Sequence, residues 1–184
     1  MNHHIPTYLA QSVYDIDYNK LYANGKRVIL FDLDNTLAPY DDSTPTDKQL
    51  ELNKKLKEIG FRIYILSNNH QKRTKLYTTI LVDGYLVLAR KPFVYKIKPF
   101  LKKENIEITN AILIGDQLLT DIKCANKLGL DSVLVKSISR KSEKWYTRIN
   151  RLREKRVINN IAKVDKEKAI AIAKIIGERN DSNE

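Results

Sequence analysis

The sequence predicts an α/β fold in which helices cover both faces of an open, mainly parallel, doubly wound sheet. Short apolar runs of strand length, such as Val28–Phe31, alternate along the chain with longer segments of helical period. Polar residues follow several of these runs, either directly or within a few positions. Because a strand, a helix and the next strand connect by right-handed crossovers, this alternation places the strands parallel in one Rossmann-like sheet.

The first strand and the helix after it have the clearest boundaries. The apolar run Val28–Phe31 ends in two aspartates, as expected for a strand buried in a parallel sheet. Thr44 is expected to cap the helix, with Pro45 as its first residue, Asp47 as the capping-box acid and Gly60 at its end. The same patterns predict strands at 61–66, 85–88, 111–114 and 132–135, and helices at 71–80, 121–128 and 165–176.

The length and composition favour one compact domain with a short appendage. A chain of 184 residues can bury a core without disulfides or a structural metal, and its single cysteine, Cys124, is expected to pack against a helix. The start of the chain lacks the segments of a signal peptide, and no apolar run has the length of a membrane span. We therefore expect a cytoplasmic protein, either soluble or peripheral at a membrane.

The net charge of +11 is concentrated towards the end of the chain. Residues 136–168 hold twelve Lys and Arg against four Asp and Glu, whereas residues 1–135 hold nineteen against fifteen. This difference predicts a core at 1–140, a basic helical extension at 141–177 and a disordered polar end at 178–184. A basic surface attracts anionic partners such as RNA, an acidic membrane or a phosphorylated substrate.

Two aspartates after the first strand are the clearest candidates for a reactive site. Asp32 and Asp34 lie two residues apart, and carboxylates this close repel each other. Such a pair is tolerated where a divalent cation binds it, or where one carboxyl group stays protonated as a general acid. The alternative is structural, because an aspartate after a strand is commonly a helix cap or a turn residue.

A second acidic site follows a later strand. Gly115-Asp116 closes the strand at 111–114, and Asp121 lies five residues further on. These carboxylates are suited to complete an oxygen-ligand shell for Mg²⁺, and the glycine allows the backbone to approach the metal closely. Asp121 is also a candidate helix cap, a role that is compatible with catalysis.

Neutral and basic groups follow the two remaining strands. Ser67, with the backbone amides of Asn68 and Asn69, offers donors for phosphate oxygens, although a Ser-Asn-Asn turn alone is weak evidence. Lys91 offers a positive charge for a transferring phosphoryl group, although a lone lysine is commonly a solvated surface charge. Because ligands bind beyond the carboxyl ends of strands in such sheets, we expect all of these groups at one edge.

Four stretches, in this order, resemble the sequence motifs of the haloacid dehalogenase (HAD) superfamily. They are FDLDNTL at Phe31–Leu37, ILSNN at Ile65–Asn69, ARKP at Ala89–Pro92 and IGDQLLTD at Ile114–Asp121. More narrowly, the chain resembles the YqeG family of capless (subclass IIIA) phosphatases, which is related to mitochondrial phosphatidylglycerophosphate phosphatases. The likeness runs from Pro6 to the segment WYTRINR at 145–151.

The resemblance implies a Mg²⁺-dependent phosphomonoester hydrolase that acts through an aspartyl phosphate on Asp32. Asp34 would protonate the leaving oxygen and then activate water. Magnesium would be held by the Asp32 carboxylate, the backbone carbonyl of Asp34 and Asp116. The other roles that the resemblance implies are phosphate binding by Ser67, Asn68 and Lys91, support of the loops by Thr36 and Gly115, and orientation of Lys91 or a metal-bound water by Asp121.

Three positions depart from the family pattern or invite another role. Lys98-Pro99 falls where the family continues a helix, so a helix is expected to begin near Pro99 or to kink there. Cys124-Ala125 replaces small glycines after the fourth motif, which affects helix packing rather than catalysis. His70 follows the Ser-Asn-Asn turn and is expected at the surface, outside the catalytic set.

The spacing of the motifs leaves no room for a cap domain. Only the loop at 38–43 separates the first motif from its helix, and one helix with a short strand fills the gap between the second and third motifs. We therefore expect an open site, which suits a large substrate that provides its own lid. The resemblance implies a phospholipid phosphate such as phosphatidylglycerophosphate.

The basic extension has two interpretations. Trp145, Ile149 and Leu152 share one helical face, and Arg148, Arg151 and Lys155 share another, as in helices that lie on anionic membranes. Alternatively, the apolar face packs on the sheet and the charges are solvated. The competing function is a phosphatase-like protein whose basic tail binds RNA or the ribosome. A receiver-type signalling domain is disfavoured, because its phosphorylated aspartate would follow the third strand.

Overall fold

Six strands form a single sheet in the part of the chain that the structure describes. The computed structural model describes residues 3–42, 44–80, 82–139 and 145–177, with side chains throughout except at 73 and 145–152. The strands are β1 (Tyr8–Ala10), β2 (Val28–Phe31), β3 (Arg62–Leu66), β4 (Gly84–Leu86), β5 (Ala111–Gly115) and β6 (Asp131–Val135). Their order is β1-β6-β5-β2-β3-β4, and every neighbouring pair is parallel. The predicted open parallel sheet is confirmed.

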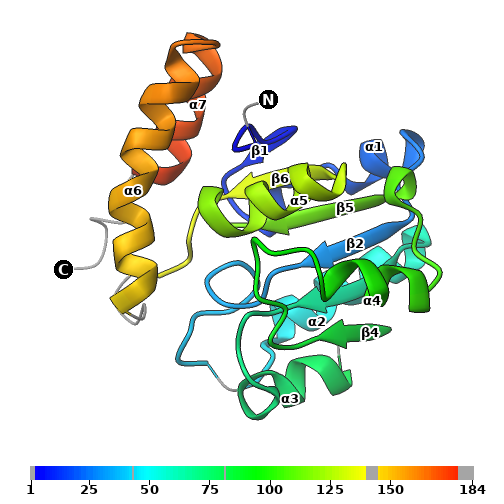
Figure 1. The fold of residues 1–184 in the computed structure, drawn as a ribbon. Helices are drawn as coiled ribbons and strands as arrows, with labels where there is room; N and C mark the ends of the chain where they lie inside the picture. The colour runs from blue at the N-terminus through cyan, green and yellow to red at the C-terminus, as the bar shows by residue number, and fades with distance from the viewer. Residues whose placement is uncertain (1–2, 43, 81, 140–144, 178–184) are drawn as a thin grey trace.

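Helices cover both faces of the sheet, as Figure 1 shows. The α-helices are α1 (Tyr18–Ala23), α2 (Asp47–Ile59), α3 (Gln71–Ile80), α4 (Ile97–Lys103), α5 (Lys123–Leu128), α6 (Trp145–Ala162) and α7 (Lys166–Gly177). The 3-10 turns η1 (Val13–Asp15) and η2 (Ile108–Asn110) and the π-helical turn η3 (Leu118–Ile122) complete the list. No described helix combines the length and the apolar character that a membrane span requires.

The strand order creates a topological switch at β2, which lies in the middle of the sheet. From β2 the chain proceeds outward to β3 and β4, and it then returns to β5 on the other side of β2. Phe31, the last residue of β2, pairs with Ile65 of β3 and Ile114 of β5. The residues that follow these strands therefore emerge at the same level, at the edge where such sheets bind ligands.

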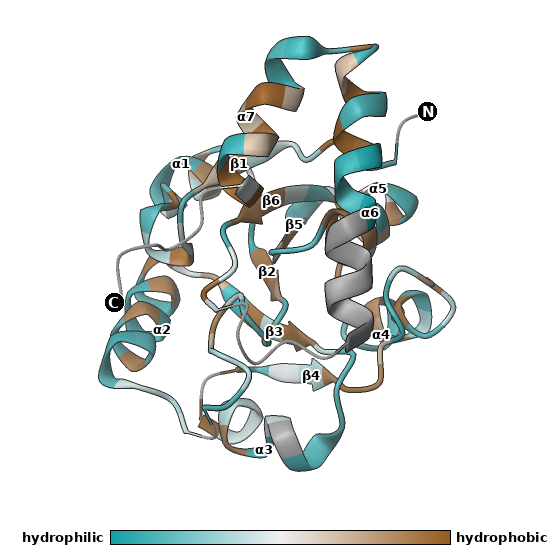
Figure 2. Ribbon diagram, turned by 90° about the vertical axis from the view of Figure 1, so that its left-hand side faces the viewer, coloured by the Kyte–Doolittle hydropathy of each residue, from teal (hydrophilic) through white to brown (hydrophobic). Residues whose placement is uncertain are grey.

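Alternating side chains of the central strands build a separate core on each face. Ile29 and Phe31 point to the face covered by α1, α2 and α3, where Leu56 of α2 completes the cluster. Val28 and Leu30 point to the opposite face, which α4 and α5 cover. Because both of their faces are buried, β2 and β5 consist of apolar residues and glycine, and Figure 2 shows β2 in the brown of hydrophobic residues.

The start of α2 corrects one prediction. Thr46, not Thr44, is the N-cap: its hydroxyl accepts a hydrogen bond from the Gln49 amide, and the Gln49 side chain accepts one from the Thr46 amide. The capping-box partner is therefore Gln49 rather than Asp47. The Gln49 side chain also donates to the Leu37 carbonyl, so it ties α2 to the loop after β2. The bond to the Leu37 carbonyl favours a helix that starts after Thr46 rather than after Thr44.

Other element boundaries agree with the predictions or move by a few residues. The third predicted strand ends at Leu86 instead of Leu88, because Leu88 has a left-handed φ of 50° that takes the chain out of the sheet. The helix predicted near Pro99 runs over Ile97–Lys103, so Pro99 lies in its first turn. The short elements β1 and α1 were not predicted. Cys124 lies on α5 and is buried in the core, as expected.

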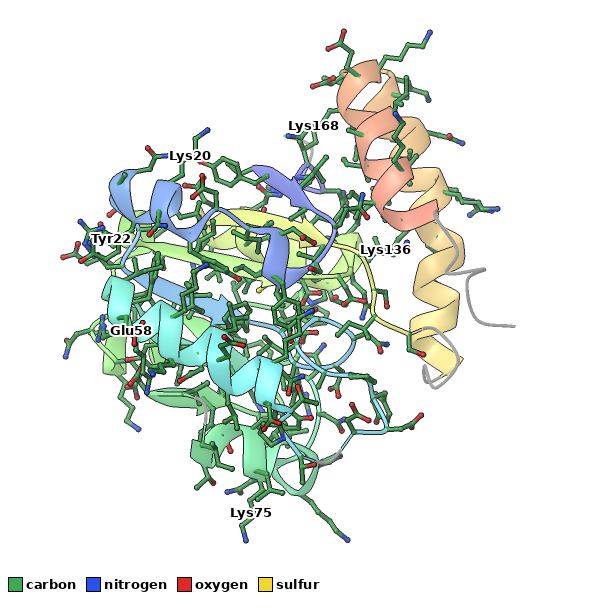
Figure 3. The ribbon with its side chains drawn as sticks, turned by 180° about the vertical axis from the view of Figure 1, so that it is seen from behind. Lys20, Tyr22, Glu58, Lys75, Lys136 and Lys168 are labelled. Atoms are coloured by element: carbon green, nitrogen blue, oxygen red, sulfur yellow. The ribbon has the colours of Figure 1, made fainter. Side chains whose placement is uncertain are left out.

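The helical extension packs against one end of the sheet. Ile161 of α6 and Ile172 and Ile175 of α7 form an apolar cluster with Leu134 of β6. Lys168 on α7 donates to the Thr7 carbonyl beside β1, and Figure 3 shows Lys168 near this end. The described apolar side chains of α6 and α7 thus pack on the rest of the protein. The face predicted for Trp145, Ile149 and Leu152 and the end segment at 178–184 lie outside the described side chains.

Gly60, which ends α2, has a backbone conformation that other residues rarely adopt. Its φ is 107°, and a Cβ there would lie 2.8 Å from the Tyr22 hydroxyl. Tyr22 is held in place by Phe61, whose ring packs edge-on at 5.3 Å, and by the Arg27 guanidinium at 3.8 Å. Figure 3 shows Tyr22 of α1 close to the end of α2 that carries Glu58.

We therefore expect Gly60→Ala to lower the free energy of unfolding by about 1–2 kcal/mol, measured by urea denaturation. Gly25→Ala is the matched control, because Gly25 has a φ of 86° and no atom within 4 Å of the added Cβ. The difference between the two variants isolates the contact with Tyr22. Equal losses would show that only the left-handed backbone matters, and an unchanged stability of Gly60→Ala would contradict the prediction.

Candidate active site

The loop after β2 turns sharply and separates its two aspartates. Asn35 has a left-handed φ of 63°, and its amide donates to the Ala38 carbonyl at 2.7 Å. Asp32, directly after the strand, is buried and points towards Lys91. Asp34 is half-buried and points instead towards Asn69, whose amide nitrogen lies 3.4 Å from Asp34 Oδ2. The turn thus gives the two carboxylates different surroundings.

Lys91 is a buried cation at the centre of the site, and its side chain is 1% exposed. Its Nζ lies 2.6 Å from Asp32 Oδ1 and 2.7 Å from Asp121 Oδ1. The Asn68 side chain holds the Lys91 backbone at two points, since it accepts from the Lys91 amide at 2.7 Å and donates to the Lys91 carbonyl at 3.0 Å. The segment after β4 therefore delivers a fixed ammonium group to the ends of β2 and β5.

Three buried carboxylates converge beside this lysine. Oxygen atoms of Asp32, Asp116 and Asp121 all lie within 4.8 Å of one another. The Thr36 hydroxyl lies 3.3 Å from Asp32 Oδ2 and 3.4 Å from Asp116 Oδ1, so it bridges the loops after β2 and β5. The fourth motif brings Asp116 and Asp121 together through the π-helical turn η3, a geometry that is common at functional sites.

Gly115 makes this convergence possible. A Cβ at this position would lie 2.4 Å from both Cβ and Cγ of Asp121, closer than real side chains approach. The absence of a side chain lets Asp121 fold back over the end of β5 and reach Lys91. Asp121 Oδ2 also accepts from the Gln117 amide at 3.1 Å, which fixes the direction of its carboxylate.

Burial and charge act in opposite directions on the two central groups. Burial raises the pKa of Asp32 well above its usual value; Lys91 lowers it, and the carboxylates of Asp121, Asp116 and Asp34 raise it further. Burial lowers the pKa of Lys91, but Asp121 and Asp32 outweigh this effect and raise it above its usual value. Lys91 is thus a permanent cation, while burial and the neighbouring carboxylates disfavour the ionised form of Asp32.

The donor set fits a divalent cation such as Mg²⁺. Three carboxylates gather around one ammonium group, and a divalent cation would offset the repulsion between their ionised forms. All the donors are oxygen atoms, the ligands that Mg²⁺ prefers. Asp121 belongs to this group of carboxylates, but Asp34 does not, because its carboxylate points towards Asn69.

The second motif has a different internal arrangement from the one that the sequence suggested. Ser67 is buried, and its hydroxyl accepts from the Asn69 amide at 3.0 Å, so that amide is used within the turn. The Asn68 side chain holds Lys91, and only its backbone amide is left as a candidate phosphate donor. Asn69 also donates to the Tyr40 hydroxyl at 3.0 Å, which places Tyr40 beside Asp34.

His70 and Cys124 lie outside the acidic cluster, and a third residue, Glu154, was not predicted to have a role. His70 is exposed, as expected. Cys124 is buried nearby in the core, and burial raises the pKa of its thiol to about 12, so it is unreactive at neutral pH. Glu154 of α6, however, is fully buried and accepts from the Leu118 amide at 2.9 Å. Its signal in the sequence is that it is the only acid in Trp145–Ala162.

Sequence comparison identifies relatives over most of the chain. A family model described as HAD-hydrolase-like matches residues 88–164. A Bacillus subtilis (strain 168) protein named Probable phosphatase YqeG is 31% identical over 155 residues, which cover 84% of this chain and 90% of that protein. This relative therefore spans nearly the whole of both chains.

Solved structures with the same fold come from the same superfamily. A predicted HAD-like family hydrolase from Porphyromonas gingivalis has a TM-score of 0.52 at 13% identity, covering 70% of this chain and 98% of that one. A HAD family enzyme from Bacteroides thetaiotaomicron, described in complex with magnesium and inorganic phosphate, has a TM-score of 0.50 at 14% identity, covering 67% and 99%. The fold and the sequence relationship agree: the protein belongs to the YqeG family of HAD-type phosphatases.

Proposed function

We propose that this protein is a Mg²⁺-dependent phosphomonoester hydrolase in which Asp32 carries the phosphoryl group. The observation that carries the proposal is the buried Asp32 carboxylate, 2.6 Å from the Lys91 ammonium and grouped with Asp116 and Asp121 at the carboxyl edge of the sheet. A carboxylate nucleophile splits a difficult hydrolysis into two easier displacements. The name of the Bacillus relative, a probable phosphatase, supports the same class of reaction.

In the first displacement, an Asp32 oxygen forms a bond to phosphorus while the bond from phosphorus to the leaving oxygen breaks. Asp34 gives its proton to that leaving oxygen. In the second displacement, Asp34 takes a proton from water, the water oxygen bonds to phosphorus, and the bond to Asp32 breaks to release phosphate. The separate surroundings of the two carboxylates suit these separate roles, because Asp34 lies beside the Asn69 side chain, whereas Asp32 pairs with Lys91.

The remaining residues bind or orient. Lys91, the Ser67 hydroxyl and the Asn68 backbone amide would bind the phosphoryl oxygens, and Asp121 would hold Lys91 in place through the 2.7 Å ion pair. Thr36 and Gly115 would support the loops that carry Asp32 and Asp116. Mg²⁺, held by the Asp32 carboxylate, the Asp34 carbonyl and Asp116, would polarise the phosphoryl group and relieve its repulsion with the nucleophile.

We propose a large, anionic lipid phosphate, such as phosphatidylglycerophosphate, as the substrate. The described residues between β2 and α2 and between β3 and β4 contain no inserted domain that could close over Asp32. A substrate held at a surface would exclude water itself. Residues 136–168, which include most of the basic extension, have a net charge of +8, and this charge would favour binding to an anionic surface. We also propose that the chain divides into a core at 1–140 and a helical extension at 141–177.

The test is phosphate release from an aryl phosphate and from phosphatidylglycerophosphate, sugar, nucleotide and peptide phosphates, each with Mg²⁺ and with EDTA. We expect release only with Mg²⁺, recovery when Mg²⁺ is restored, and the highest kcat/KM for the lipid phosphate. No release from any of these substrates with Mg²⁺ present would refute the catalytic proposal. Preference for a small soluble ester would refute only the lipid.

The basic extension is tested separately by flotation with anionic liposomes and by RNA retention at matched salt. We expect flotation without RNA retention. The reverse result would favour the alternative function, an RNA- or ribosome-associated protein with a phosphatase-like core. Binding to neither would leave the extension with a structural role only.

A further inference from the structure

Glu154 is a fully buried carboxylate that lies outside the four motifs. It belongs to α6, and the described residues next to it, Arg153, Lys155 and Arg156, are exposed. Removing a carboxylate from water is costly unless polar groups surround it. Glu154 accepts a hydrogen bond from the backbone amide of Leu118 at 2.9 Å, across 36 residues of sequence. Its burial therefore serves a contact with the turn that follows β5.

Leu118 is the first residue of η3, which continues into α5. The first amides of a helix have no carbonyl partner within the helix, and a side chain just before it normally accepts from one of them. The residue at this position, Gln117, makes no such side-chain bond. Glu154 provides the acceptor instead, from a helix distant in sequence.

The same turn carries a residue of the catalytic cluster. Asp121 lies three residues after Leu118 and accepts from the Gln117 amide at 3.1 Å. Its other oxygen lies 2.7 Å from Lys91 Nζ, and Lys91 Nζ lies 2.6 Å from Asp32. The adjacent amides of Gln117 and Leu118 thus donate to two different carboxylates. Asp121 of the active site accepts from Gln117, and Glu154 of the helical extension accepts from Leu118.

Apolar contacts between the same two parts accompany this bond. Leu118 and Ile122 of η3 are buried in one cluster with Ile161 of α6 and Ile172 of α7. These apolar contacts hold the extension against the turn, but they do not determine the direction in which the Leu118 amide points. The hydrogen bond from Leu118 to Glu154 is directional, and it fixes the rotation of the turn on which Asp121 is mounted.

We propose that Glu154 is a positioning residue for the active site: it caps the η3 turn and so holds Asp121 and, through it, Lys91 in the orientation that catalysis needs. The inference rests on the proposed function, since it assigns a role in the same site. It makes the helical extension a working part of the catalytic unit, in addition to any partner that its basic surface binds.

The test compares Glu154→Ala with Glu154→Gln in the full-length protein. The alanine variant lacks the acceptor, so we expect kcat for an aryl phosphate to fall roughly 10-fold, with KM changed by less than about twofold. Glutamine retains a carbonyl oxygen and is expected to restore kcat to nearly that of the wild type. Hydrogen exchange of the Leu118 and Asp121 amides, measured without Mg²⁺, should be faster in the alanine variant and close to normal in the glutamine variant.

Ile161→Val is the matched control, because it loosens the same helix through an apolar side chain and leaves Glu154 in place. We expect it to lower the unfolding temperature without the fall in kcat. The proposal is overturned if Glu154→Ala retains wild-type kcat and amide exchange, or if Ile161→Val lowers kcat equally. A wild-type protein without phosphatase activity would refute the proposed function, whereas the exchange rates would still decide whether Glu154 holds the turn.

Discussion

Asp32→Asn should abolish phosphate release, with kcat falling by at least about 1,000-fold, which corresponds to about 4 kcal/mol of barrier. The asparagine amide has nearly the shape of the carboxylate but cannot form the phosphoryl bond. Phosphate release under saturating Mg²⁺ measures the effect. Residual activity near that of the wild type would remove Asp32 from the role of nucleophile.

The same substitution should not weaken the fold. Asp32 is buried in one group with Asp116 and Asp121, and burial together with the neighbouring carboxylates raises its pKa, so a neutral replacement relieves repulsion. Without Mg²⁺, we expect the thermal unfolding temperature of Asp32→Asn to equal or exceed that of the wild type. Asp131→Asn is the control, because it removes a carboxylate at the opposite end of the sheet, where Asp131 pairs with Lys26 at 2.6 Å. It should keep full activity.

Gly115→Ala should damage both stability and catalysis. The new Cβ would lie 2.4 Å from the Cβ and Cγ of Asp121, a side chain that is itself buried and paired with Lys91. Neither β5 nor η3 can move freely, because each packs in the core. Overpacking of this kind costs about 1–3 kcal/mol of unfolding free energy, and we expect a value near the upper end.

Urea denaturation and phosphate release on the same preparation measure the two effects of Gly115→Ala. Gly177→Ala is the matched control, since a Cβ at Gly177 meets no atom within 4 Å, and it should change stability by less than about 1 kcal/mol. If Gly115→Ala retained wild-type stability and activity, Asp121 could not depend on the close approach that the structure shows.

Patterns that depend on neighbours in sequence were predictable, and contacts between distant segments were not. The central strands are buried on both faces, so runs such as Val28–Phe31 identify them without knowledge of their partners. Strand β1 is three residues long and partly exposed, which leaves too little pattern to detect. The N-cap of α2 moved to Thr46 because Gln49 also bonds the Leu37 carbonyl, a tertiary contact.

The same limit applies to the active site. The order of the motifs predicted that Asp32, Lys91 and Asp116 would meet, because the ends of parallel strands share one edge. It did not predict that the Asn68 side chain would hold the Lys91 backbone, or that Asp34 would turn towards Asn69. Those details depend on side-chain directions that only the packed structure determines.

The two outermost strands have a consequence for how copies of this protein meet one another. β1 and β4 are each only three residues long, whereas the four strands between them have a neighbour on both sides. An edge strand presents unpaired backbone groups that another chain can extend into a shared sheet, and short edges offer few of them. Edges as short as β1 and β4 therefore disfavour the extension of this sheet by a second copy of the chain.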